Sequence, residues 1–431
     1  MSLAVWLTFA FRLAALSLLA VSPPNMPQSL LTFESIVAAA HRLKGHVRKT
    51  PLQPSARLSK MLGGDIWMKM ENMQHTGAYK ERGALNKLQS LTEAQRAKGV
   101  CAASAGNHAQ GLAYHAGRLG IASTIFMPLG TPVIKVTRTQ DYGATVQLVG
   151  RDFDEAFSAC LEHMKTQDAT LVHPFDDPHI ISGQGTIGLE MLDQNPNLDV
   201  LVVPVGGGGM ISGIARAAKE INPKIRIIGV EPAKIPSMAR YIAGDTALQP
   251  ACTTIADGIN VRKVGKLTAE LCRQYVDDFV TVTDEEICRA MLFLLEGEKC
   301  VAEGAGAAGV AALLSGKIDT KGRNVGTVIC GGNIDVNVMA QVIECGLVDT
   351  GRRVRLSMEL QDRPGSLSKL MMQIAEAKAN VVSVSHERTK SASFGTARVQ
   401  MTLDVRGAEH AKAIHDALAP LFADSGGIRI D

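Results

Sequence analysis

The stretch DVLVVPVGGGGMISGIARAAKEINP, residues 199–223, decides the fold class. It opens with a run of valine and leucine, passes through four consecutive glycines, and continues as an alanine-rich segment. A continuous apolar run of this length is typical of a strand buried on both faces, and the alanine-rich segment is typical of a helix. The stretch therefore predicts one strand–turn–helix unit of an α/β protein.

Other parts of the chain repeat this pattern from about residue 34 onward. Helix-like segments rich in alanine and leucine separate the apolar runs. This alternation predicts an α/β fold with mostly parallel sheets. The other expected strands are residues 65–70, 99–104, 123–128, 144–149, 225–231 and 325–330.

The sequence changes character after about residue 346. The following segments read strand, turn, helix, strand, and then strand, turn, helix, which we interpret as a βαββαβ unit of about 80 residues. A unit of this size can form a separate small α+β domain. We place the boundary near 346–352, with one domain over 26–346 and a second over 352–431.

The composition is that of an ordinary globular protein, with 431 residues, a net charge of +3, 20% charged and 46% hydrophobic residues. Lysine and arginine are scattered without a basic run, which argues against a nucleic-acid partner. The eight cysteines form no CxxC motif and do not cluster with histidines. We therefore expect neither a disulfide framework nor a zinc site, and we expect a reducing compartment, the cytoplasm.

The N-terminus is unusually apolar. Residues 3–21, LAVWLTFAFRLAALSLLAV, contain only one charge, Arg12. The segment is long enough to span a bilayer, but Arg12 at its centre would cost about 2.5–3.5 kcal/mol. Nothing basic precedes the apolar run, which argues against a secretory signal. We interpret residues 1–25 as an extension upstream of a start at Met26, with a membrane anchor as the alternative.

The four glycines at 206–209 stand between the expected strand and helix. Without side chains, the backbone N–H groups can converge on an anion at the helix N-terminus. The run matches neither GxGxxG nor GxxxxGK(S/T), which disfavours a dinucleotide or nucleoside-triphosphate loop. A tight turn with positive φ is the alternative, although one or two glycines would be enough for it. We interpret the run as a phosphate-binding turn.

Two further turns follow expected strands. The first, SAGNHAQG at 104–111, offers Ser104 and Asn107 beside free N–H groups, and helix capping by Ser104 would also explain it. The second, VICGGNID at 328–335, ends a strand at Cys330. Ligands of open α/β sheets lie beyond the carboxyl ends of strands, but a buried cysteine before a loose turn would give the same pattern.

The stretch HTGAYKERGALNKL, residues 75–88, places Lys80 directly after Tyr79. Most lysines are solvated surface residues, so Lys80 alone is weak evidence for catalysis. In a chain that also has a phosphate-binding turn, it becomes a candidate for a lysine that forms a Schiff base.

Five motifs carry a resemblance to a known family. GAYKERGAL, SAGNHAQG, PVGGGGMISG, ADGINV and CGGNID occur in the order found in the threonine/serine dehydratase branch of the fold-type II pyridoxal-phosphate enzymes. The chain resembles this family over residues 34–345, and the final segment, with its DRPGSL loop, resembles an ACT regulatory domain. The resemblance implies two open, twisted α/β subdomains, the smaller spanning roughly 70–160.

The same resemblance implies the binding partners. These are pyridoxal 5′-phosphate, a small-molecule amino-acid substrate, and an amino-acid effector of the ACT domain, for which we expect isoleucine or valine. Most relatives form homotetramers, so we expect a homo-oligomer. A biosynthetic role, as in isoleucine biosynthesis, and a catabolic role are not separated by the motifs.

The resemblance also assigns roles to single residues. Lys80 would bind the cofactor covalently and act as the general base, and Tyr79 stands where the family usually has phenylalanine. Cys330, usually serine in this branch, would face the pyridine nitrogen. The other residues implied at the cofactor are Asn107 at the 3-hydroxyl, Gly206, Gly207, Gly208, Gly209 and Met210 at the phosphate, and Gly258 lining the site. The residues implied at the substrate are Ser104, Ala105, Gly106, Asn107 and Glu303.

The reaction implied is the elimination of water from L-threonine, and also from L-serine, to give 2-oxobutanoate or pyruvate and ammonia. Serine racemase is an alternative, but it has a serine where this chain has Ala105, so a second acid/base group is not evident. The metal site of serine racemase pairs a glutamate with an aspartate six positions later. This chain has the glutamate, Glu231, but Ser237 in place of the aspartate, so we expect no metal.

Two more functions are compatible with the motifs. A serine-preferring dehydratase is possible, since one methyl group is worth only about 1–3 kcal/mol of discrimination between threonine and serine. A non-catalytic amino-acid sensor that uses the ACT domain is possible too, although the intact Lys80 and the four glycines argue against it.

Overall fold

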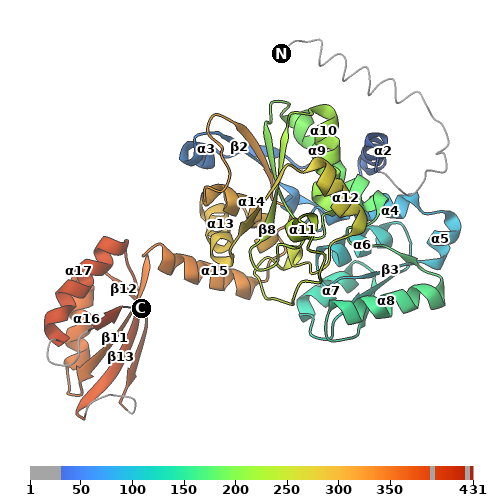
Figure 1. The fold of residues 1–431 in the computed structure, drawn as a ribbon. Coiled ribbons are helices and arrows are strands. Elements are labelled where there is room, and N and C mark those ends of the chain that lie inside the picture. The colour runs from blue at the N-terminus through green and yellow to red at the C-terminus, as the bar shows by residue number, and fades with distance from the viewer. Residues whose placement is uncertain (1–30, 389–393, 423–427, 431) are drawn as a thin grey trace.

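The structure is a computed structural model that describes residues 31–388, 394–422 and 428–430 (Figure 1). The apolar segment 1–25 lies outside the described residues. A search of the described part found no helix with the length and apolar character needed to cross a membrane.

The elements of the described residues run as follows. The helices are α2 (Phe33–Leu43), α3 (Ala56–Leu62), η1 (Glu71–Met73), α4 (Lys80–Ser90), α5 (Glu93–Lys98), α6 (Asn107–Arg118), α7 (Val133–Asp141), α8 (Phe153–Gln167), α9 (Pro178–Gln194), α10 (Gly209–Ile221), α11 (Ser237–Ile242), η2 (Asp257–Ile259), α12 (Lys266–Tyr275), α13 (Asp284–Gly297), α14 (Gly304–Leu314), α15 (Val336–Asp349), α16 (Ser366–Glu376), α17 (Ala408–Leu418) and η3 (Ala419–Phe422). The strands are β1 (Leu52–Pro54), β2 (Asp65–Lys69), β3 (Val100–Ala103), β4 (Ser123–Met127), β5 (Thr145–Leu148), β6 (Thr170–Leu171), β7 (Val200–Pro204), β8 (Arg226–Pro232), β9 (Asp278–Val282), β10 (Asn324–Val328), β11 (Arg353–Gln361), β12 (Asn380–Glu387), β13 (Thr396–Asp404) and β14 (Ile428–Ile430).

The large lobe is built on a six-stranded sheet with the order β1-β2-β10-β7-β8-β9, in which only β1 runs antiparallel. Every residue of β7 is buried, as its continuous apolar sequence predicts. Helices cover both faces of the sheet. In β10, Gly326 approaches Met191 of α9, whereas its neighbour Thr327 approaches Gly309 of α14.

The small lobe contains a four-stranded parallel sheet with the order β5-β4-β3-β6. All seven expected strands are present, which confirms the predicted α/β class. The edge strand β5 differs from the expectation, because three of its four residues are exposed. Three strands of the two parallel-type sheets were not predicted, namely β1, β6 and β9.

The C-terminal lobe forms an antiparallel sheet with the order β12-β13-β11-β14, and α16 and α17 complete the predicted βαββαβ topology. Its β11 and β13 alternate between buried and more exposed residues, as expected for a sheet with one covered face. Helix α15 links this lobe to the large lobe (Figure 1). Its Gly346 packs closely against Leu292 of α13.

Candidate active site

Lys80 is the first residue of α4, and Tyr79 occupies the N-cap position. The Lys80 Nζ donates a hydrogen bond of 2.7 Å to the carbonyl oxygen of Pro174 and lies 5.4 Å from the centre of the Tyr79 ring. Among the described residues, no carboxylate lies within ion-pair distance of this amine. Removal from water lowers the pKa of Lys80 to about 8, although Cys330 and Glu303 oppose the shift.

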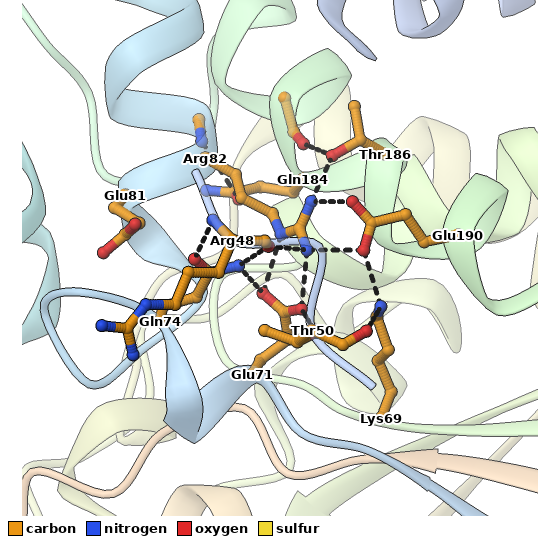
Figure 2. A network of polar contacts seen from close by, with 12 residues as sticks. Arg48, Thr50, Lys69, Glu71, Gln74, Glu81, Arg82, Gln184, Thr186 and Glu190 are labelled. Atoms are coloured by element: carbon orange, nitrogen blue, oxygen red, sulfur yellow. Dashed lines mark hydrogen bonds and ion pairs between the residues drawn. The ribbon is translucent and has the colours of Figure 1, made fainter. Parts of the chain in front are cut away.

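A buried charged network holds the start of α4 through Arg82 (Figure 2). Arg82 is fully buried and donates to both carboxylate oxygens of Glu71, at 2.7 and 2.8 Å, and to both of Glu190, at 2.7 and 2.8 Å. Such bidentate pairs constrain orientation strongly. The backbone two residues after Lys80 is therefore held in place.

The turn before Lys80 is joined to the turn after β10. The Tyr79 N–H donates to the carbonyl oxygen of Cys330 at 3.1 Å, and the Gly332 N–H donates to the carbonyl oxygen of Gly77 at 2.9 Å. Gly77 has a φ of +73°, and a Cβ there would lie 2.6 Å from the side-chain oxygen of Asn333. Two motifs separated by about 250 residues in sequence thus form one structural unit.

Asn107 connects this unit to the small lobe. Its Nδ2 donates to Glu303 Oε1 at 2.6 Å, and its Oδ1 accepts from Asn333 Nδ2 at 2.9 Å. The Glu303 N–H donates to the carbonyl oxygen of Gly331 at 3.0 Å. Burial, assisted by the charge of Asp257, raises the pKa of Glu303 to about 7. Asn107, Glu303 and the turn after β10 therefore meet around one point.

The turn before α6 is open for an anion. The helix begins at Asn107 with Gly106 as its N-cap, and no side chain caps it. Ser104 accepts a hydrogen bond of 3.2 Å from the Gly106 N–H, so the interpretation of Ser104 as a helix cap is wrong. Ala105 packs against the apolar core of the small lobe. The N–H groups of the first helical turn can therefore receive a carboxylate.

The four-glycine turn leads into α10, whose N-cap is Gly208 with a φ of +90° and no side-chain capping bond. Among the four glycines only Gly208 has a positive φ, so backbone conformation explains the need for glycine at that position alone. At Gly207 a Cβ would lie 2.3 Å from the Phe175 ring, and at Gly206 it would lie 2.9 Å from Ile259 Cα. Close packing therefore requires these two glycines, and the turn presents main-chain N–H groups without side chains. Met210 follows in the first turn and is buried.

A segment that the sequence analysis missed connects Lys80 to the glycine turn. Pro174 accepts the hydrogen bond from Lys80, and the adjacent Phe175 packs against Gly207 and Gly209. His173 Nδ1 accepts from the Phe175 N–H at 3.3 Å, which stabilises this bend. The preceding strand β6 has only two residues, too few for a periodic signal, so the only available hint was the polar run that follows it.

The remaining predicted site residues lie beside this group. Gly258 is in η2, and a Cβ there would lie 3.4 Å from Glu303 Oε1. Cys330 is buried, and burial raises the pKa of its thiol well above the ordinary value, so the thiol is neutral near pH 7. Asn333, which bonds to Asn107, is a further residue that the sequence analysis did not single out.

The racemase-type metal position has a structural use in this chain. The buried Glu231 accepts backbone N–H groups from Met238 at 2.7 Å and Ala239 at 2.9 Å. Within the residues that the structure describes, no group of three or more His, Cys, Asp and Glu side chains has the arrangement of a metal site.

These features fit pyridoxal phosphate. A partly buried amine without a carboxylate partner suits a lysine that condenses with an aldehyde. A helix N-terminus with main-chain N–H groups and no intruding side chain, at Gly208, suits a phosphate group. The neutral Cys330 thiol suits an uncharged pyridine nitrogen.

Comparison with known proteins agrees with this fit. Residues 43–331 match the pyridoxal-phosphate dependent enzyme family, and residues 349–421 match the ACT domain family. The chain is 49% identical over 391 residues to an L-threonine ammonia-lyase of Thermotoga maritima, a match that covers 90% of this chain and 97% of the relative.

Two solved structures are similar as well. The processed form of threonine deaminase isoform 2 from Solanum lycopersicum has a TM-score of 0.69 and 33% identity, and the match covers 75% of this chain and 99% of that one. Maize serine racemase has a TM-score of 0.70 and 35% identity over the same shares. The chain therefore belongs to the fold-type II family of pyridoxal-phosphate dependent enzymes and carries a C-terminal ACT domain.

Proposed function

We propose that the protein is a threonine ammonia-lyase, which eliminates water from L-threonine and then takes up one water to release ammonia, giving 2-oxobutanoate, and which acts on L-serine in the same way to give pyruvate. One observation carries this proposal. A partly buried Lys80 amine without a carboxylate partner is linked through Pro174 and Phe175 to a helix N-terminus free of side chains, in a chain 49% identical over 90% of its length to an L-threonine ammonia-lyase. Each role given below to a single residue is part of the proposal.

Lys80 is the residue that holds the cofactor and moves protons. When bound, pyridoxal phosphate supplies an electron sink that weakens the Cα–H bond of an amino acid. Lys80 Nζ, once released by the substrate amine, takes the Cα proton. A pKa lowered to about 8 supports this role, because more of the amine is unprotonated near neutral pH than in an exposed lysine.

The substrate and cofactor are oriented by the turns around Lys80. The uncapped turn of Ser104, Ala105, Gly106 and Asn107 receives the substrate carboxylate, and Glu303 holds Asn107 in position. Tyr79 packs beside the amine. The phosphate is bound by the turn Gly206, Gly207, Gly208 and Gly209 with the Met210 N–H, and Gly258 lines the site.

The neutral thiol of Cys330 favours elimination. Cys330 faces the pyridine nitrogen in this proposal, and a neutral thiol cannot hold that nitrogen protonated as a carboxylate would. A weaker electron sink suits rapid loss of a β-hydroxyl group more than long-lived negative charge at Cα.

Serine racemisation is the second candidate function, because maize serine racemase is among the similar structures. A racemase needs an acid or base on the face opposite to Lys80. Ala105 offers no such group at the position where the resemblance places a serine, and it packs against the small-lobe core. Elimination is therefore the better-supported reaction.

The ACT domain supports an amino-acid effector, and we propose isoleucine or valine. A homo-oligomer, a tetramer by analogy, and a cytoplasmic location remain proposals. So do domain limits of 26–346 and 352–431.

The test combines chemistry with product analysis. The full-length protein is loaded with pyridoxal phosphate, reduced with borohydride and digested, and the modified peptide should contain Lys80 and not the nearby Lys69. L-threonine, L-serine and D-serine are then supplied, with 2-oxo acid and chirality measured. We expect 2-oxobutanoate as the dominant product. Dominant D-serine from L-serine, or no label on Lys80, would refute the proposal.

A further inference from the structure

Two ion pairs cross between the lobes at the rim of the site. Lys135, on α7 of the small lobe, places its Nζ 2.8 Å from the Asp257 carboxylate of η2 in the large lobe. Arg262 of the large lobe lies 3.0 Å from Asp154 of α8. The partners are separated by more than a hundred residues in sequence, so each pair is a tertiary contact between lobes.

The segment that carries Asp257 packs on the proposed site. Its neighbour Gly258 lies against Glu303, and Ile259 lies against Gly206 of the glycine turn. This three-residue helix is the only regular element between α11 and α12 in the described chain. Since short irregular segments have little intrinsic order, their position depends on contacts of this kind.

A hydrogen bond also crosses between the lobes, beside the Lys135–Asp257 ion pair. Asn107 of α6 donates to Glu303 at 2.6 Å, and Gly258 packs against the same carboxylate. Burial is the main influence on the pKa of Glu303 and raises it. The charge of Asp257 raises it further, whereas the hydrogen bond from Asn107 and then the charge of Lys135 lower it. Both charges of the rim pair therefore act on the residue that holds Asn107.

We infer that the Lys135–Asp257 pair is a clasp that positions η2, and through it Gly258 and Glu303, over the turn that receives the substrate carboxylate. The inference rests on the proposed function for the identity of that turn. Lys135 and Asp257 are positioning residues, since neither touches the reacting atoms. The clasp holds the two lobes together at the rim of the site.

The exposure of the pair determines how it can be tested. The side chains of Lys135 and Asp257 are 25% and 60% exposed, so salt screens their attraction. The matched control is Lys219, whose ion pair with Asp277 is also 2.8 Å long and 19% and 36% exposed. The control pair joins two segments of the large lobe and lies on no lobe boundary.

The experiment measures amide hydrogen exchange of residues 253–262 in the full-length holoenzyme, together with the KM for L-threonine. In Lys135→Met we expect exchange to accelerate and KM to rise, each about two- to five-fold, the effect expected for one exposed ion pair. The kcat should change less than KM. Lys219→Met should leave both measurements unchanged, and raising salt to about 0.5 M should reproduce the exchange effect in the wild type.

Reversing the charges of the Lys135–Asp257 pair completes the test. Lys135→Asp alone should accelerate exchange further, because two like charges then face each other, and the double variant with Asp257→Lys should restore the wild-type rate. Wild-type exchange and KM in Lys135→Met, or no restoration in the double variant, would overturn the clasp. Failure of the wild type to turn over threonine would refute the proposed function instead, and the exchange comparison would still be valid.

Discussion

Two lysines only eleven residues apart have different surroundings. Lys69, at the end of β2, donates to Glu190 at 2.6 Å and to the carbonyl oxygen of Thr50 at 2.6 Å, within the network of Figure 2. Lys80 donates to the carbonyl oxygen of Pro174, without a carboxylate within ion-pair distance in the described part of the chain.

The difference between Lys69 and Lys80 shows which of the two charged groups has a structural role. Lys69 and Arg82 are matched by Glu71 and Glu190, so the network carries no net charge and its donors have partners. Burial lowers the pKa of both lysines. Only for Lys69 do two carboxylates, Glu190 and Glu71, oppose this shift, and Glu190 also accepts a hydrogen bond from its amine. An amine withdrawn from water without a carboxylate partner is costly, and proteins retain such groups mainly at functional sites.

The largest effect should follow from removing the unpaired amine. In Lys80→Ala we expect kcat for L-threonine to fall about a thousandfold or more, because the residue both binds the cofactor and moves the Cα proton. Lys69→Met is the matched control. It should keep the borohydride-dependent label on Lys80, and loss of that label would mean that the two lysines are not functionally distinct.

Breaking the paired cluster should reduce stability more than it changes chemistry. In Glu71→Gln one partner of the buried Arg82 pair is lost, and we expect the free energy of unfolding to fall by about 3–5 kcal/mol in urea denaturation. Glu296→Gln, which disrupts the exposed pair with Arg352, should cost at most about 1 kcal/mol. Equal losses would show that the cluster is no more important than a surface pair.

The pH dependence of stability should distinguish the two lysines. The pKa of Lys80 in the folded protein, about 8, lies below its ordinary value, so the folded state binds fewer protons than the unfolded state between pH 8 and 10.5. The stability of the cofactor-free protein should therefore rise with pH across that window. At pH 7, Lys80→Met should stabilise it by about 1–3 kcal/mol, and this advantage should shrink toward pH 10.

The control for this prediction is Lys69→Met, measured by the same urea denaturation. It should destabilise the protein at pH 7, because Glu190 loses a close partner. A stabilising effect of Lys69→Met would contradict the comparison.

The smallest effect should come from the ring beside the amine. Burial raises the pKa of Tyr79 well above its ordinary value, so the hydroxyl stays neutral. Tyr79→Phe keeps the ring that packs beside Lys80, and we expect kcat and KM to stay within about threefold of the wild type. A much larger loss of kcat would show that the Tyr79 hydroxyl takes part in catalysis, a role that we assign to the Lys80 amine alone.

Local patterns predicted much of the fold. The valine-rich run of β7 followed by glycines and an alanine-rich segment was sufficient for a buried strand and helix, because hydrophobic periodicity and turn chemistry are local properties. The same reasoning predicted the βαββαβ order of the C-terminal lobe. It failed for β6, where two residues carry no period, and for the exposed edge strand β5, whose position in the sheet is a tertiary property.

The candidate site divides in the same way. Lys80, Asn107 and the four glycines could be singled out because each follows a recognisable strand or aromatic residue. Pro174, Phe175 and Asn333 could not, because their roles come from packing against segments that are distant in sequence.

The sequence by itself determined the fold class, the order of elements, and the set of residue types available for cofactor chemistry. Only the tertiary structure decided which of the two lysines has carboxylate partners and which does not. The reason is physical: the pKa of an amine depends on burial and on neighbouring charges, and these come from residues such as Glu190 of α9, more than a hundred positions away from both lysines.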